Sequence, residues 1–240
     1  MVQETSIGGA SRDFPETRWT LIVSSRQGIE ARSRALEELL QLYWKPLYHY
    51  VRRKGLSIED SKDAIQGFCA QLLDKDFLER LDPKRGRLRS YLRMAVDNFL
   101  ANRHEHASAK KRGGGAKVVS LDFDVGDADA PAGAEPGSVF EREWALAVME
   151  RAMTRLEREF ASGERKGPFA LVRRFFDFQG EPPSYDDAAR ESGMSPSQLK
   201  AFLHRARVRF RELVLDEVKD TVSEGDPEAE VQELIRALRP

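Results

Sequence analysis

The chain has 240 residues, of which 40% are hydrophobic and 33% are charged, and its formal net charge is −1. This length supports one large domain or two small ones, and the balanced charge excludes a uniformly polycationic protein. No run approaches the ~18 apolar residues that span a bilayer, and the first residues lack the apolar core of a signal peptide. The single cysteine, Cys69, excludes an intramolecular disulfide. We therefore expect a reduced, cytoplasmic protein.

The first part of the chain has helical periodicity. Residues 1–15 are polar and rich in small residues, and we expect a flexible N-terminus, followed by a short docked turn near Trp19. Spaced apolar residues predict four further helices, at 31–43, from Pro46 to Gly55, at 58–73 and at 88–106. We expect these helices to form a first domain over 16–112, with basic residues gathered at its C-terminal end.

The middle and last parts of the chain differ in composition. Residues 113–138 hold six glycines, two prolines and five acidic residues, which predicts a flexible acidic linker. A second helical domain is expected over 139–218, and an acidic extension with a last amphipathic helix over 219–240. The predicted fold class is all-α: two small helical domains joined by a flexible linker, the second a helix-turn-helix.

The helix-turn-helix prediction depends on residues 184–211. Ala188 and Ala189 suit a close helix contact, Gly193 suits a left-handed turn, and Ser195 with Pro196 suits the start of a second helix. That helix is basic, as expected for a major-groove reader. The residues near its start that suit base or phosphate contacts are Ser197, Gln198, Lys200 and Ala201. The residues further along that suit phosphate contacts are His204, Arg205, Arg207 and Arg209.

The basic helix of the first domain suits a different nucleic-acid contact. Its polar residues that suit an unpaired strand are Asn98, Arg103, His104, Lys110, Lys111 and Arg112. No catalytic constellation is evident, and His104 and His106 do not share a helix face, so neither an enzyme, a metal site nor a cofactor is expected.

Together these parts resemble bacterial extracytoplasmic-function (group IV) sigma factors of RNA polymerase, over roughly 43–213. The stretches that carry the resemblance are YWKPLYHYVRR (43–53), IEDSKDAIQGFCAQLL (58–73), RGRLRSYLRMAVDNFLANR (85–103) and SYDDAARESGMSPSQLKAFLHRARVRFREL (184–213). The resemblance implies a transcription initiation factor without catalysis of its own, which lends promoter specificity to core RNA polymerase.

The resemblance also implies roles for individual residues. Asp60, Lys62, Asp63 and Gln66 would lie in the patch that faces the polymerase β′ coiled coil, and the C-terminal domain would meet the β flap. The minus-ten element would be contacted by Arg89, Arg93, Asn98, Arg103, His104, Lys110 and Lys111. The minus-thirty-five element would be contacted by Ser197, Gln198, Lys200, Ala201, His204 and Arg205. An anti-sigma factor or a protein kinase is a further expected kind of partner.

The polymerase-binding stretch departs from the family pattern. Residues 60–67 read DSKDAIQG, so Lys62 and Gly67 stand where the family usually has acids, which weakens complementarity to a basic partner. Ser61, expected on an exposed face, is a candidate phosphorylation site, because a phosphate would restore the missing charge. The simpler interpretation is an ordinary polar surface residue. The acidic extension is a second departure, expected to pack on the second domain or to screen the basic helix.

Two other functions remain open from the sequence. A stand-alone helix-turn-helix DNA-binding regulator is the main alternative, although the chain has neither a dimerisation heptad nor a sensing domain. A helical interaction protein without a DNA role is the third.

Overall fold

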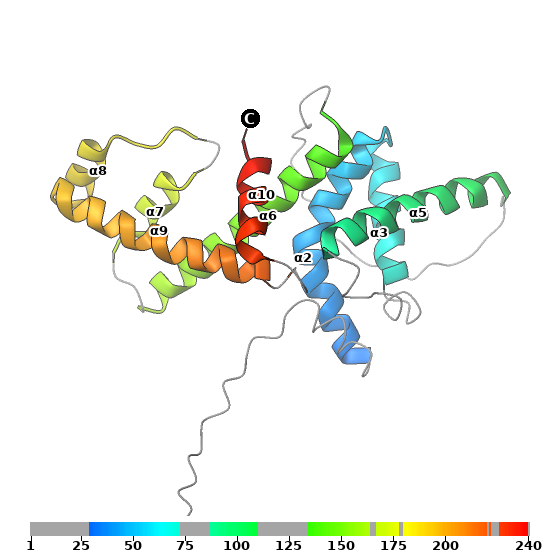
Figure 1. The fold of residues 1–240 in the computed structure, drawn as a ribbon, viewed down its shortest axis with the longest axis horizontal. Helices are drawn as coiled ribbons and strands as arrows, with labels where there is room; N and C mark the ends of the chain where they lie inside the picture. Colours follow the sequence, from blue (N-terminus) through cyan, green and yellow to red (C-terminus); the bar gives the residue numbers. More distant parts are fainter. Residues whose placement is uncertain are drawn as a thin grey trace, which may run out of the picture.

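The structure is a computed structural model of the whole chain. It describes residues 29–72, 87–109, 134–163, 167–177, 180–219, 221 and 226–239. These residues form eight helices and no strand, so the all-α expectation is confirmed (Figure 1). The N-terminus, the docked turn near Trp19 and residues 113–133 of the expected linker lie outside the described residues.

Helix α2 (Ile29–Arg53) corrects one expectation, because it is a single helix with Pro46 inside it rather than two helices. A proline in a helix interior removes one backbone hydrogen bond and costs about 3 kcal/mol. Leu42, Leu47 and Val51 are buried on either side of Pro46, and their burial offsets that cost. The helix ends as expected before Gly55, whose φ of +99° is left-handed.

Helices α3 (Ile58–Leu72) and α5 (Leu88–Ala109) pack against α2. The apolar stripe of α3 is buried as its spacing predicts, and Phe68 is fully covered. The rings of Phe68 and Phe99 meet edge to face at 5.8 Å, which joins α3 to α5. These three helices form the blue-to-green half of Figure 1.

Helix α6 (Pro136–Ala161) is the long element that joins the two ends of the molecule. Its first turns lie on α2, where the Phe140 ring meets the Tyr50 ring at 6.0 Å. Its later turns lie on α9 (Pro196–Lys219), and both Arg151 and Arg155 donate to the buried Glu217 carboxylate at 3.0 Å. One cluster of buried hydrophobic side chains therefore runs from α2 through α6 to α9.

The remaining helices lie beside α9. They are α7 (Phe169–Phe175), α8 (Tyr185–Ser192) and α10 (Pro227–Ala237). Helix α10 stands at the middle of the molecule and packs on both α6 and α9 (Figure 1). Val231 and Leu234 are its buried apolar side chains, so the predicted amphipathic helix of the acidic extension is confirmed and belongs to the core.

Candidate nucleic-acid interface

The turn between α8 and α9 has the geometry that its residues predict. Gly193 has a φ of +66°, a conformation that costs glycine little. The Met194 amide donates to the Ala189 carbonyl at 3.1 Å, which closes the end of α8. Ala188 and Ala189 are buried, and their small side chains allow α8 to lie against α9.

One face of α9 points away from the protein. The α9 side chains that are buried toward α8 and the core include Leu199, Phe202, Leu203 and Ala206. All six residues predicted to read the minus-thirty-five element are exposed, namely Ser197, Gln198, Lys200, Ala201, His204 and Arg205. Ser197, Ala201 and His204 recur at helical spacing, so they share one face of the helix. Val208, 48% exposed, extends the same row and adds an apolar contact surface.

A capping box fixes the start of α9. The Gln198 amide donates to Ser195 Oγ at 3.3 Å, and the Ser195 amide donates to Gln198 Oε1 at 2.8 Å. The side-chain oxygen of Gln198 is therefore engaged within the protein, and only its NH₂ group remains for another partner. Adenine recognition by glutamine uses both groups, so the structure disfavours that bidentate contact.

The basic side chains of α9 are not equally available. Lys200 leans over the Tyr185 ring, with Nζ 5.9 Å from its centroid, and Arg207 donates to Tyr185 Oη at 3.3 Å. Arg209 donates to both carboxylate oxygens of Glu159, and this hydrogen bonding raises the pKa of its guanidinium. Arg209 is thus held against α6, which disfavours the phosphate contact expected of it. Arg205 forms no hydrogen bond or ion pair with the described part of the chain.

Those of the predicted minus-ten residues whose side chains the structure describes are spread around α5 and do not form one surface. Arg89 is only 3% exposed, so it cannot reach DNA in this conformation. Asn98 is exposed on the face of α5 that is roughly opposite Arg89. Arg103 Nη1 lies 3.5 Å from the Asp60 carbonyl, at the start of α3. The His104 side chain, Lys110 and Lys111 lie outside the described residues, as does Arg112.

Arg93 lies beside a polar cavity between α2, α5 and α6. Its Nη1 is 3.6 Å from Glu141 Oε1, and its side chain is 35% exposed. In the same cavity Asp97 accepts hydrogen bonds from Tyr50 at 2.9 Å and Lys54 at 2.6 Å. Burial, followed by the Asp97 hydrogen bond, raises the pKa of Tyr50, and the Asp97 bond raises the pKa of Lys54. Arg93 is therefore more exposed than Arg89, but it shares its cavity with the carboxylates of Asp97, Glu135 and Glu141.

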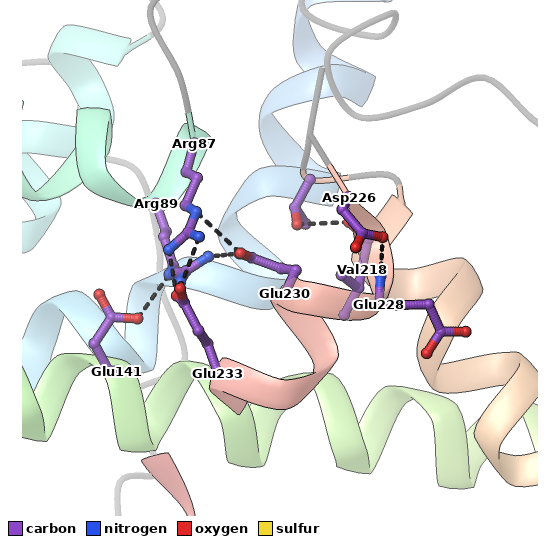
Figure 2. Close-up of polar contacts among 9 residues, drawn as sticks. Arg87, Arg89, Glu141, Val218, Asp226, Glu228, Glu230 and Glu233 are labelled. Carbon is purple, nitrogen blue, oxygen red and sulfur yellow. Dashed lines mark hydrogen bonds and ion pairs between the residues drawn. The ribbon is translucent and has the colours of Figure 1, made fainter. Parts of the chain in front are cut away.

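Arg89 is surrounded by the carboxylates of Glu141, Glu230 and Glu233 (Figure 2). Its Nε donates to Glu141 at 2.6 Å and its Nη2 to Glu233 at 3.0 Å. It also pairs with Glu230, and its guanidinium lies 4.3 Å from the Trp144 ring centroid. Planar stacking and forked hydrogen bonds both suit a guanidinium, so this environment stabilises the charge of Arg89.

The predicted polymerase-binding patch lies at the start of α3. Ser57 caps this helix, accepting from the Asp60 amide at 3.1 Å and donating to its carboxylate at 2.6 Å. Asp60 and Asp63 are exposed one turn apart, and Gln66 is half-buried on the next turn. Lys62 Nζ lies 3.6 Å from Glu59, so the lysine is partly neutralised by its own helix. The patch therefore retains an acidic character.

Ser61 corrects the expectation of an exposed serine. Its side chain is fully buried, and its hydroxyl has no hydrogen-bond partner in the part of the chain that the structure describes. A kinase needs an accessible hydroxyl, so phosphorylation at this position requires the start of α3 to open. The folded state described here disfavours the phosphorylation hypothesis, and the surface interpretation is wrong as well.

Gly67, which with Lys62 departs from the family pattern in this stretch, has a packing role. A Cβ atom at this position would lie 3.0 Å from Cζ of Phe99. Glycine thus lets α5 approach α3 closely, and Phe99 fills the space that a side chain would take. The missing acid at this position is explained by helix packing.

The residues of this region that sequence reasoning missed are Glu141, Trp144, Glu217, Glu230 and Glu233. Glu217 and Glu230 are almost completely buried, at 3% and 1% exposure. Buried carboxylates require paired cations, but the partners here lie far away in the sequence. For Glu217 and Glu230, the available signal was that each glutamate lies among the apolar positions of its helix, α9 or α10.

The chain matches no known protein-family profile, no curated protein and no solved structure. Within the described ranges, no helix is long and apolar enough to cross a bilayer. In the same ranges, no three His, Cys, Asp or Glu side chains are arranged to hold a metal ion. Cys69 is buried, and burial raises the pKa of its thiol to about 12.

Proposed function

We propose that the chain is a sigma factor of the extracytoplasmic-function type, which binds core RNA polymerase and directs it to promoters. The observation that carries this proposal is the outward face of α9, on which all six predicted minus-thirty-five residues are exposed. In this proposal α8 and α9 are a helix-turn-helix. The division into two domains joined by a linker is the arrangement proposed for the factor when it is bound to core RNA polymerase.

The outward face of α9 suits the major groove. Its first turn presents Ser197 and the NH₂ group of Gln198, and its second presents Ala201 and His204. Small and apolar side chains contact the thymine methyl group, and hydroxyl and amide groups donate to base edges. Arg205, exposed and without a hydrogen-bond or ion-pair partner among the described residues, would bind a phosphate and set the register of the helix.

The exposed acids of α3 suit a basic partner. Asp60 and Asp63 lie on successive turns of a helix that is capped at its first turn, so both carboxylates are held on a rigid element. Charge complementarity of this kind steers association and fixes orientation. The proposed partner is the basic coiled coil of the polymerase β′ subunit, and Lys62 weakens the match.

The first test is co-elution of the purified chain with core RNA polymerase on gel filtration. We expect a stable complex that Asp63→Lys weakens and Lys62→Glu strengthens. The matched control is Glu157→Lys, which makes the same charge change on an α6 side chain that is 51% exposed. Equal co-elution of the Asp63→Lys and Glu157→Lys variants would contradict the assignment of the α3 patch.

The second test separates promoter reading from polymerase binding. Arg205→Ala should reduce promoter-dependent transcription without reducing co-elution, because Arg205 lies on α9 and the acidic patch lies on α3. Tight binding to duplex DNA without polymerase, unaffected by Asp63→Lys, would instead favour a stand-alone regulator. The absence of both DNA binding and co-elution would favour a helical interaction protein.

A further inference from the structure

The start of α5 and the C-terminal helix α10 form one charged cluster, although they are more than 130 residues apart in the sequence. Arg87 Nε lies 3.0 Å from Glu230 Oε2, and Arg87 Nη2 donates to Glu233 Oε1 at 2.9 Å. Arg89 Nη2 donates to the same Glu233 carboxylate at 3.0 Å. Figure 2 shows both guanidinium groups directed at the carboxylates of α10.

Helix α10 is held in this position by its other contacts. Asp226 caps it by accepting from the Glu228 amide at 3.0 Å. Val231 and Leu234 are buried, and Glu228 accepts from Arg211 of α9 at 2.9 Å. The contacts to α6 and α9 fix which side of α10 faces α5, and that side carries Glu230 and Glu233.

The cluster matters because its arginines lie at the start of the proposed minus-ten helix. A guanidinium binds a carboxylate and a phosphate through the same forked geometry, so the two kinds of anion compete for it. Glu230 is almost fully buried. Glu230 and Glu233 of α10 hold the Nη1 and Nη2 groups of Arg89, whereas Glu141 and Trp144 of α6 hold its Nε and its face. A DNA phosphate can bind the Nη groups of Arg89 only after α10 moves away.

We propose that Glu230 and Glu233 occupy, within the free protein, the place of DNA phosphates on Arg87 and Arg89. The C-terminal helix is then an internal competitor of promoter DNA for these two arginines, and its release frees the groups of Arg87 and Arg89 that its carboxylates hold. This inference rests on the proposed function, because it gives Arg89 the minus-ten contact that the resemblance to sigma factors implies. It also gives the acidic extension a role, since the competing carboxylates belong to it.

Competition of this kind lowers the apparent affinity for DNA in a defined way. When only a fraction of the protein is open, the apparent dissociation constant rises in inverse proportion to that fraction. Because α10 is part of the same chain, its effective concentration at the arginines is high. Weakening the carboxylate contacts should therefore tighten DNA binding, although each change removes protein contacts and adds none to DNA.

The experiment uses the full-length chain and a labelled single-stranded oligodeoxynucleotide of mixed sequence. Glu233→Gln removes one competing charge from a side chain that is 36% exposed, so the fold should persist. We expect it to bind the oligonucleotide about tenfold more tightly than the unchanged chain, which corresponds to about 1.4 kcal/mol. The matched control, Glu228→Gln, removes the same charge from the same helix but faces Arg211, and it should bind like the unchanged chain.

A second readout needs no variant. Hydrogen exchange of the unchanged chain should become faster in α10 and slower in residues 87–96 when the oligonucleotide is added in excess. Unaltered exchange in α10 while the oligonucleotide is bound, or equal affinities for the Glu233→Gln and Glu228→Gln variants, would overturn the competition. Both readouts are made without polymerase, so a failure to initiate transcription would overturn the proposed function and leave this result standing.

Discussion

Arg89 and Glu230 form an ion pair between α5 and α10 in which both side chains are almost absent from the surface, at 3% and 1% exposure. Removing one partner of such a pair leaves an uncompensated buried charge. We expect Arg89→Ala to lower the free energy of unfolding by about 3–5 kcal/mol, the range typical of broken buried pairs. Urea denaturation measures this change.

The same pair allows a control for its net contribution. Replacing both residues with apolar side chains, as in Arg89→Met with Glu230→Leu, should cost much less than Arg89→Ala, because the almost fully buried Glu230 carboxylate is then removed together with its partner. Glu141 and Glu233 also contact Arg89, so some cost should remain. A double variant as unstable as Arg89→Ala would show that geometry, and not the unpaired charge, dominates this site.

The α10 contacts should weaken in acid. Hydrogen bonding from Arg87 holds the pKa of Glu233 below its ordinary value of 4.5, with Arg89 and Arg236 adding to the effect. A carboxyl group with a lowered pKa contributes stability above its unfolded pKa, and that contribution is lost as the pH falls through the folded value. The melting temperature of Glu233→Gln should lie below that of the unchanged chain near pH 6, and the two should converge below pH 4.5. A constant difference across this range would contradict the assignment.

Gly67 and Phe99 should behave as a coupled pair. Gly67→Ile places a branched Cβ where the Phe99 ring already lies 3.0 Å away, so we expect a loss of about 1–3 kcal/mol from overpacking. In the Phe99→Ala background the same substitution should cost less, since the space is then open. Denaturant unfolding of the four proteins completes the cycle, and additive losses would contradict the close approach of α3 and α5.

Ser61 offers a direct test of the phosphorylation hypothesis. Its hydroxyl is buried and has no hydrogen-bond partner among the described residues, and an unsatisfied buried polar group costs about 1–3 kcal/mol. Ser61→Ala should therefore leave stability unchanged or raise it, whereas Ser61→Asp should destabilise the protein by burying a charge. A stable Ser61→Asp protein with stronger polymerase binding would contradict this account and would revive phosphorylation as the control of α3.

Local signals in the sequence were sufficient for most of the helices. The start of α3 and the end of α8 follow from Ser57 and Gly193, because caps and left-handed turns depend on neighbouring residues. Pro46 was misleading, since the packing of α2 outweighs the local penalty of a proline. Packing energy depends on residues far away in the sequence, and no local pattern reports it.

The candidate site was predictable only where it is made of one helix. The exposed face of α9 follows from its periodicity, whereas the burial of Arg89 depends on α10, which meets it only in the folded chain. The burial of Ser61 and the contact of Gly67 with Phe99 likewise depend on how α3 packs. A charged residue that the sequence suggests is exposed can instead be buried at the centre of an ion-pair cluster. Only the tertiary structure distinguishes the two cases.

The most direct test of the central claim is transcription of total genomic DNA from the source organism by core RNA polymerase with and without the purified chain, with sequencing of the transcript 5′ ends. The account predicts transcript starts that appear only with the chain and that share two upstream sequence elements at a fixed spacing. Arg205→Ala should reduce these starts, because Arg205 is the exposed α9 arginine that has no internal partner within the described residues. An identical set of starts with and without the chain would contradict the account.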